Sequence, residues 1–139
     1  MFDLCIYTPS KMVGRFQVKH VRFPGAEGLL GVGANHTPFV SKLKSGILFF
    51  ETVQSERQYY YVSGGLVHIE SNNLDILVES LESPKEIDKQ KAKDLEKQSL
   101  EVLKHLTPQT DISRTLEALE QARQRIQLVE SVEGRNPGH

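Results

Sequence analysis

The chain has 139 residues, a length that suits one domain, or one small domain with an appended segment. Its 17 basic and 18 acidic residues nearly cancel, which excludes the electrostatic footprint expected of a nucleic-acid-binding or anionic-lipid-binding protein. A single cysteine, Cys5, excludes an internal disulfide bond and a cysteine-based zinc site, and no apolar run is long enough to span a bilayer.

The first 82 residues carry short apolar runs, several of them alternating with polar residues, separated by turn-forming pairs. We predict strands at residues 2–7, 16–23, 39–43, 47–52, 57–62, 66–70 and 74–79. Tight turns are predicted at Ser45-Gly46, Gln54-Ser55, Gly64-Gly65 and Asn72-Asn73. Because no helical pattern separates these strands, they predict an antiparallel β-sandwich or barrel. The first four residues lack the pattern of a secretion signal, so we expect a cytosolic chain or one bound to a cytosolic assembly.

Residues 23–38, FPGAEGLLGVGANHTP, concentrate glycine and proline within this β-rich part. Pro24-Gly25 predicts the end of a strand, and the three following glycines predict turns, bulges or a close backbone approach. Their spacing is not G-x-G-x-x-G, and a strand pattern follows where a phosphate-binding loop needs a helix. Segments with so much special backbone geometry commonly build a binding surface, so we expect one here.

The composition changes near residue 83. All ten aromatic residues lie between Phe2 and Tyr61, and no glycine occurs between Gly65 and Gly134. Aromatic residues suit strands, whereas a long stretch without glycine suits helices. We therefore predict a β domain over residues 1–82 and a helical domain over residues 83–139.

Two helices are predicted in the second domain. Residues 83–86, SPKE, form a capping box with proline at the first helical position, which predicts a helix to about residue 105. Thr110 or Asp111 caps a second helix that runs to about residue 131, and the short connection predicts an antiparallel hairpin. The expected stripes are Ala92, Leu95, Ser99, Val102, Leu103 and Leu106 on the first helix, and Ile112, Leu116, Leu119, Ala122, Ile126 and Val129 on the second.

The expected seam between these helices contains small residues and no aromatic residue, so we expect the hairpin to be only marginally stable by itself. Such a hairpin can switch between arrangements, and a permanently docked helical pair is the alternative. We expect no catalytic residues and no metal site. His36 lacks a defined base-orienting partner, and the acids from Glu79 to Asp88 are interspersed with lysines in the manner of a solvated helix start.

The pattern Pro-Gly-x-Glu-Gly-x-x-Gly-x-x-x-x-His-x-Pro, from Pro24 to Pro38, resembles the signature loop of the epsilon subunit of F-type ATP synthases. Residues 62–65, VSGG, and the order of a β-rich part before two helices agree with that family, so the resemblance covers roughly the whole chain. It implies a non-catalytic, peripheral subunit that couples proton transport to ATP synthesis only within the complex. It places the chain at the cytoplasmic face of a bacterial inner membrane or at the stromal face of a thylakoid.

The same resemblance assigns partners to each part. The β-sandwich would bind the gamma subunit, and the loop would contact the c-ring through Glu27, Leu29, Asn35, His36 and Pro38. The helical hairpin would fold down against the sandwich, or extend along gamma and inhibit ATP hydrolysis. In the extended arrangement Arg123 and Arg125 would meet acidic residues of the beta subunit.

Residues 87–92, IDKQKA, resemble a segment with which some bacterial epsilon subunits hold ATP. By this resemblance the nucleotide residues are Ile87, Asp88, Lys91, Ala92 and Arg125. Lys91 and Gln121 stand where arginines are expected, and lysine cannot make the planar, bidentate contacts of a guanidinium group. We therefore expect ATP to be at most a weak regulatory ligand. The alternative function is a stand-alone, nucleotide-responsive binding module with no rotary role.

Overall fold

A computed structural model of the protein describes residues 1–25, 28–32 and 38–135. The chain divides into two compact units, Met1–Ser83 and Pro84–His139, and the predicted boundary after residue 82 falls one residue before this division. In the part of the chain that the structure describes, no helix is both long enough and apolar enough to cross a bilayer.

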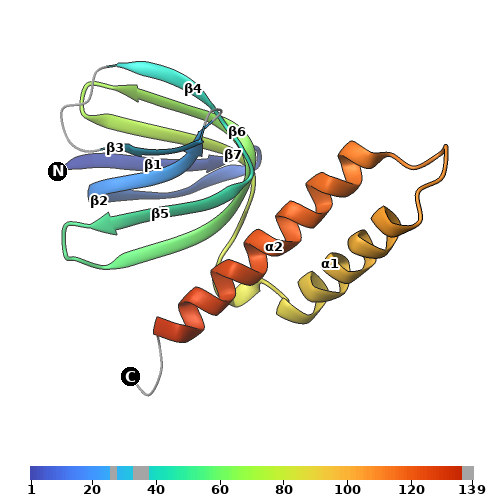
Figure 1. Cartoon of the computed structure of the whole chain (residues 1–139). Helices are drawn as coiled ribbons and strands as arrows, with labels where there is room; N and C mark the ends of the chain where they lie inside the picture. Colours follow the sequence, from blue (N-terminus) through green and yellow to red (C-terminus); the bar gives the residue numbers. More distant parts are fainter. Residues whose placement is uncertain (26–27, 33–37, 136–139) are drawn as a thin grey trace. The chain divides into compact units, whose positions relative to one another are not determined.

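The first unit is a β-sandwich (Figure 1). Its strands are β1 Phe2–Thr8, β2 Lys11–Gly25, β3 Gly28–Val32, β4 Phe39–Leu43, β5 Gly46–Thr52, β6 Arg57–Glu70 and β7 Asn73–Glu82. All pairs of neighbouring strands are antiparallel except β1 and β7, which run parallel from the pair Asp3–Asn73 to the pair Tyr7–Leu77. The predicted sandwich is confirmed, although it is not antiparallel throughout.

Two long strands connect the others. The first half of β6 pairs with β5, its second half pairs with β4, and β7 follows it along most of its length. In the same way β2 pairs first with β1 and then with β5 and β3. Alternate side chains along the strands of the sandwich point inward, and the fully buried ones include Leu4, Ile6, Val18, Val21, Phe23, Leu48, Phe50, Val62 and Ile76.

The structure corrects three local predictions in this unit. The turn predicted at Gly64-Gly65 is wrong, because β6 passes straight through both residues. The turn between β6 and β7 is formed by Ser71 and Asn72, with φ of 50° and 62°, one residue before the predicted pair. Strand β3 was not predicted. Its glycines interrupt the alternation of apolar residues from which strands are predicted, although Leu30 and Val32 keep that spacing.

The second unit is a hairpin of two antiparallel helices, α1 Lys89–Lys104 and α2 Ile112–Arg135, preceded by the 3₁₀ turn η1 Pro84–Glu86 (Figure 1). The predicted start of the first helix is wrong. Pro84 lies in the 3₁₀ turn, and the α-helix begins after Asp88, whose backbone is extended and whose carboxylate accepts a hydrogen bond from the Lys91 amide at 3.1 Å. The aspartate therefore performs the capping that the sequence assigned to a serine.

The second helix is capped by Asp111, whose carboxylate accepts from the Arg114 amide at 3.0 Å. Thr110, the other candidate, instead accepts a hydrogen bond from the Thr107 amide inside the connecting turn. The helix continues to Arg135, beyond the predicted end near residue 131.

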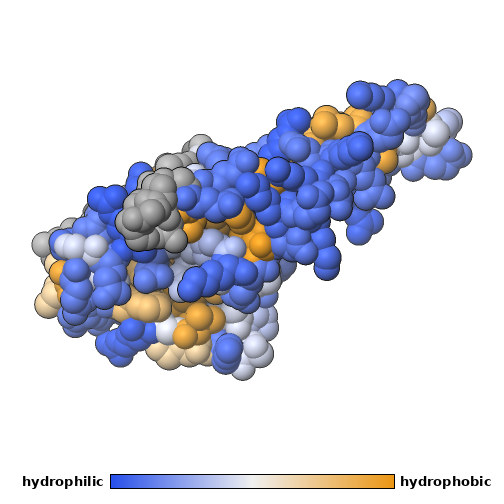
Figure 2. Space-filling model, turned by 90° about the horizontal axis from the view of Figure 1, so that it is seen from below, coloured by the Kyte–Doolittle hydropathy of each residue, from blue (hydrophilic) through white to orange (hydrophobic). Residues whose placement is uncertain are grey.

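The seam of the hairpin is buried at its base and exposed at its tip. The buried residues of the two helices include Ala92, Ser99, Leu119, Ala122 and Leu128. Leu128 was not in the predicted stripe, and its neighbour Val129 is only partly buried. Four residues of the predicted stripes are exposed near the turn between the helices, and apolar surface is visible there in Figure 2: Val102, Leu106, Ile112 and Leu116.

Candidate interaction surfaces

The segment expected to contact the c-ring is described only in part. Glu27, Asn35 and His36 lie outside the described residues. Leu29 pairs through its backbone with Pro24, within the hairpin of β2 and β3, and Pro38 is exposed just before β4. The assignment of these five residues to a partner therefore stays a prediction.

A different surface of the sandwich has the composition of a protein-binding site. Leu66 on β6 lies directly opposite Leu77 on β7, and Leu77 lies directly opposite Tyr7 on β1. Leu66 and Leu77 are 46% and 44% exposed, and Val40 on the neighbouring strand β4 is 64% exposed. We call Tyr7, Val40, Leu66 and Leu77 the outer apolar face. It is carried by four adjacent strands, so its side chains are held by the sheet.

A shallow hollow of about 240 Å³ lies on the outer apolar face. Most of its accessible lining is apolar, and its walls include Tyr7, Pro9, Leu66 and Leu77. Thr8 and Glu79 also line the hollow and supply polar groups. This arrangement can accept an apolar side chain from a partner.

Some of the titratable groups near this face have partners, but Lys42, which lies opposite Leu66 on β4, and Glu79 in the hollow form no ion pair among the described residues. His68 lies 3.4 Å from the Glu70 carboxylate and 3.9 Å from that of Asp75, and the Arg15 guanidinium donates to Asp3 at 2.9 Å. The hydrogen bond with Asp3 raises the pKa of Arg15. The pKa of Tyr7 is also raised, mainly by its electrostatic interaction with Cys5 and then by burial.

The outer apolar face was not predicted, although the sequence contains a signal of it. In β7 the alternation of Leu74, Asp75 and Ile76 predicts a polar residue at position 77, yet the strand continues with Leu77 and Val78. An apolar residue in the outward phase of an otherwise alternating strand indicates an exposed apolar position.

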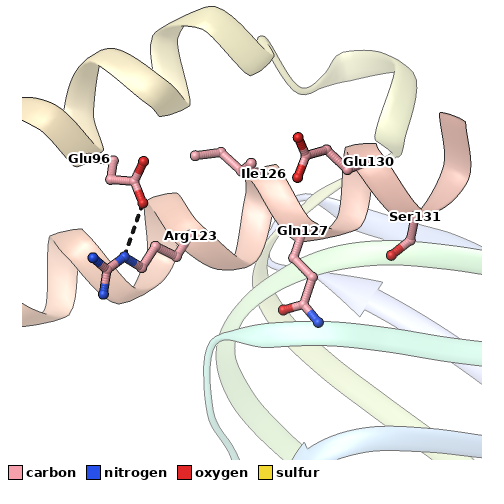
Figure 3. A pocket seen from close by; sticks show the side chains of 6 residues that line it. All are labelled: Glu96, Arg123, Ile126, Gln127, Glu130 and Ser131. Atoms are coloured by element: carbon pink, nitrogen blue, oxygen red, sulfur yellow. Dashed lines mark hydrogen bonds and ion pairs between the residues drawn. The ribbon is translucent and has the colours of Figure 1, made fainter. Parts of the chain in front are cut away.

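Ion pairs join the two helices of the hairpin. Arg123 on α2 donates from Nε to Glu96 on α1 at 3.0 Å (Figure 3). Lys89 at the start of α1 donates to Glu133 at 3.0 Å and lies 3.5 Å from Glu130, both near the end of α2. The hydrogen bond with Glu133 is the main reason that the pKa of Lys89 is raised. Arg123, a predicted contact of the beta subunit, is thus engaged within the chain itself.

A shallow hollow of about 380 Å³ follows these ion pairs along α2, and its lining combines one arginine with two carboxylates: Glu96, Arg123, Ile126, Gln127, Glu130 and Ser131 (Figure 3). None of the five predicted nucleotide residues is among them. Ile87 and Ala92 are buried, Asp88 caps α1, and Lys91 is exposed. Within the described ranges, no group of three or more histidine, cysteine or acidic residues is placed to hold a metal ion.

The fold resembles subunits of two solved assemblies. A chain of the Euglena gracilis mitochondrial ATP synthase, in a structure of OSCP, F1 and c-ring, matches with a TM-score of 0.69 and 20% identity, over 95% of this chain and 79% of that one. A chain of the Tetrahymena thermophila mitochondrial ATP synthase, in a structure of the central stalk and c-ring, matches with a TM-score of 0.55 and 15% identity, over 94% of each chain. At these identities the likeness concerns the fold alone.

Sequence comparison identifies the family as well as the fold. Residues 1–84 match the family described as ATP synthase, Delta/Epsilon chain, beta-sandwich domain. The ATP synthase epsilon chain of Nitratidesulfovibrio vulgaris (strain DP4) is 32% identical over 123 residues, which cover 88% of this chain and 91% of the relative. That of Syntrophomonas wolfei is 30% identical over 129 residues, covering 93% and 94%. The chain therefore belongs to the family of ATP synthase delta and epsilon chains, as an epsilon chain.

Proposed function

We propose that this epsilon chain is a non-catalytic subunit of the central stalk that links the gamma subunit to the c-ring and restrains ATP hydrolysis through its helical hairpin. The observation that carries the proposal is the outer apolar face, because a row of exposed apolar residues across rigid strands suits a permanent protein partner. In this arrangement the chain reaches the membrane surface only through the complex, at the cytoplasmic face of a bacterial membrane or the stromal face of a thylakoid.

On physical grounds the outer apolar face suits a protein partner, and the resemblance to the epsilon family makes gamma the proposed one. The residues of this face are neutral and lie on adjacent strands, so covering them removes no charge of their own from water. Burying Leu66 and Leu77 in an interface removes apolar area from water and stabilises the complex. The hollow beside them adds a place for one anchoring side chain.

The segment from Pro24 to Pro38 is assigned to the c-ring by its resemblance to the signature loop. Its described part is the hairpin of β2 and β3, whose end pairs Gly25 with Gly28. The outer apolar face is carried by other strands, β1, β4, β6 and β7. A chain with two separate binding surfaces can join two partners at once, as a linking subunit must.

The regulatory role is assigned to the hairpin because its tip exposes apolar residues. Val102, Leu106, Ile112 and Leu116 are between 37% and 53% exposed near the turn that joins α1 and α2. An exposed apolar tip on two helices can enter a groove of a partner and stop its movement. Arg123 and Arg125 on α2 would add contacts with acidic residues of the beta subunit.

The test replaces each surface separately in the full chain. Leu66→Lys with Leu77→Glu converts two opposed residues of the outer apolar face into a cross-strand charge pair, which preserves the strands while removing the apolar surface. The matched control, Ile112→Glu with Leu116→Lys, converts two exposed apolar residues of α2 into a charge pair of suitable helical spacing and orientation. Gamma binding is measured by calorimetry, and ATP hydrolysis is measured in the reconstituted F1 complex.

The two variants should separate the two roles. We expect the sandwich variant to weaken gamma binding by about 10- to 100-fold, as for the loss of two interface residues that together contribute about 1.4–2.8 kcal/mol. The hairpin variant should bind gamma normally and inhibit less. If the sandwich variant binds gamma as well as the unaltered chain does, the outer apolar face is not the gamma site. If the unaltered chain binds ATP but not gamma, the nucleotide-responsive module becomes the better description.

A further inference from the structure

Ion pairs connect the two helices of the hairpin. We propose that ion pairs between α1 and α2, rather than a bound nucleotide, hold this hairpin closed, so that ionic strength controls its opening. This inference goes beyond the role proposed above and can be tested on the isolated chain, so its outcome does not depend on the rotary complex.

The ion pairs are concentrated at the base of the hairpin. Lys89 is the first residue of α1, and its partners Glu130 and Glu133 lie in the last turns of α2. Glu96 lies two turns further along α1 and meets Arg123 on α2. These three contacts therefore tie the helices together over the half that is nearer to η1, where Ala92 and Ser99 are also buried.

The apolar seam contains few large buried residues. Of the buried residues of the two helices, Leu119 and Leu128 are large, whereas Ala92, Ser99 and Ala122 are small and each removes little apolar area from water when the hairpin closes. Toward the tip, Val102 and Leu116 are 37% and 50% exposed, and none of the ion pairs between described residues of α1 and α2 lies there. In a hairpin with so small a seam, ion pairs that are individually weak form a substantial part of what opposes opening.

The same charges argue against a bound nucleotide as the group that holds the hairpin closed. Glu96 and Glu130 line the hollow along α2, and carboxylates there repel the phosphates of ATP. The one arginine in that lining, Arg123, is already paired with Glu96. The Asp88 carboxylate is engaged at the helix cap, where it accepts from the Lys91 amide. Binding ATP at the base would therefore require existing contacts of this chain to break.

Screening by salt distinguishes a hairpin held closed by ion pairs from one held closed by apolar contacts. The interacting side chains are partly exposed, with Lys89 at 30% and Arg123 at 50%. At 1 M salt the Debye length falls to about 3 Å from about 10 Å at 0.1 M, so attraction between exposed charges is largely screened. Burial of apolar residues is not weakened in this way.

The experiment measures amide hydrogen exchange of α1 and α2 in the full chain at about 0.05 M and 1 M sodium chloride. In the unaltered chain we expect high salt to accelerate exchange at the base of the hairpin by about two- to five-fold. The variant Lys89→Gln with Arg123→Gln should exchange that fast already at low salt and respond little to more salt. Its matched control, Lys93→Gln with Lys97→Gln, removes two exposed lysines that have no ion pair among the described residues, and it should behave as the unaltered chain.

A charge exchange tests the pair itself. Glu96→Arg and Arg123→Glu should each accelerate exchange, and the two together should restore protection, because the attraction is re-formed with opposite polarity. If the exchange rates are equal at both salt concentrations, or if no charge variant changes them, the proposal is overturned and apolar contacts hold the hairpin closed. Slower exchange after addition of Mg-ATP, compared with sodium sulfate at the same ionic strength, would overturn the proposal in favour of a nucleotide.

Discussion

One close backbone approach fixes the path of β6 past β7. A Cβ atom added at Gly65 would collide with the carbonyl oxygen of Leu77, whereas one added at the neighbouring Gly64 would lie 3.7 Å from the carbonyl oxygen of Leu43, an ordinary contact. The two glycines therefore have different roles, although they are adjacent in the sequence. Gly65 permits the pairing that places Leu66 opposite Leu77 on the outer apolar face.

Alanine substitution separates these roles. We expect Gly65→Ala to lower the free energy of unfolding by about 2–4 kcal/mol, because the added methyl group must push β7 away from β6. Gly64→Ala is the matched control and should change it by less than about 1 kcal/mol. Urea unfolding followed by tyrosine fluorescence measures both. Equal effects of the two substitutions would contradict the close approach and would be typical of a turn at this position.

At the scale of the helices, the raised pKa of Lys89 makes part of the hairpin stability depend on pH. The carboxylates of Glu133 and Glu130 favour the charged amine in the folded hairpin, and this outweighs the opposing effect of its burial. A pKa that is higher in the folded state than in the unfolded state stabilises the fold at every pH below the unfolded value of about 10.4. The stabilisation is lost as the pH rises through the higher folded value.

Replacing Lys89 with arginine isolates this contribution, because a guanidinium group stays charged above pH 12. Lys89→Arg should match the unaltered chain in urea unfolding at pH 8, monitored by helical circular dichroism. Above about pH 10.4 the unaltered chain should lose hairpin stability relative to the variant, since all other lysines titrate equally in both. If the two chains keep the same relative stability from pH 8 to pH 11.5, Lys89 does not contribute through its charge.

Local patterns in the sequence were sufficient for most of the elements. Alternation located β4, β5 and parts of β1, β2, β6 and β7, and the glycine-free second part predicted both helices. The errors arose where a residue acts through a distant partner. Gly65 has the local appearance of a turn residue because its partner, Leu77, lies on another strand. Ser83 fits a capping box, but Asp88 has the extended backbone that a cap requires.

The interaction surfaces were harder to predict than the elements, since they depend on register. Leu66 and Leu77 form one surface only because β6 and β7 pair with this alignment, and a shift by one residue would turn them to opposite faces. Similarly, Arg123 and Glu96 are 27 positions apart, and no local spacing indicates that they meet. The resemblance of residues 24–38 and 62–65 identified the family, but it supplied none of these contacts.

At the scale of the whole molecule, the two units differ in how much they bury. The sandwich encloses a cluster of large side chains, among them Phe23, Phe50 and Leu48, whereas the hairpin buries small residues with only a few of larger size. Because stability rises with the apolar area removed from water, the hairpin should unfold at a lower denaturant concentration than the sandwich. The two units also carry different spectroscopic signals, which allows each transition to be observed separately.

All four tyrosines lie in the sandwich and the chain contains no tryptophan, so tyrosine fluorescence follows the first unit, while circular dichroism at 222 nm is dominated by α1 and α2. We expect the helical signal to reach its midpoint at a urea concentration about 1–2 M below that of the tyrosine signal. A fully folded sandwich with an open hairpin would then be an accessible state, as a regulatory hairpin requires. Coincident transitions would instead mean that the chain unfolds as one cooperative body, in which the helices cannot open without disrupting the surface proposed to bind gamma.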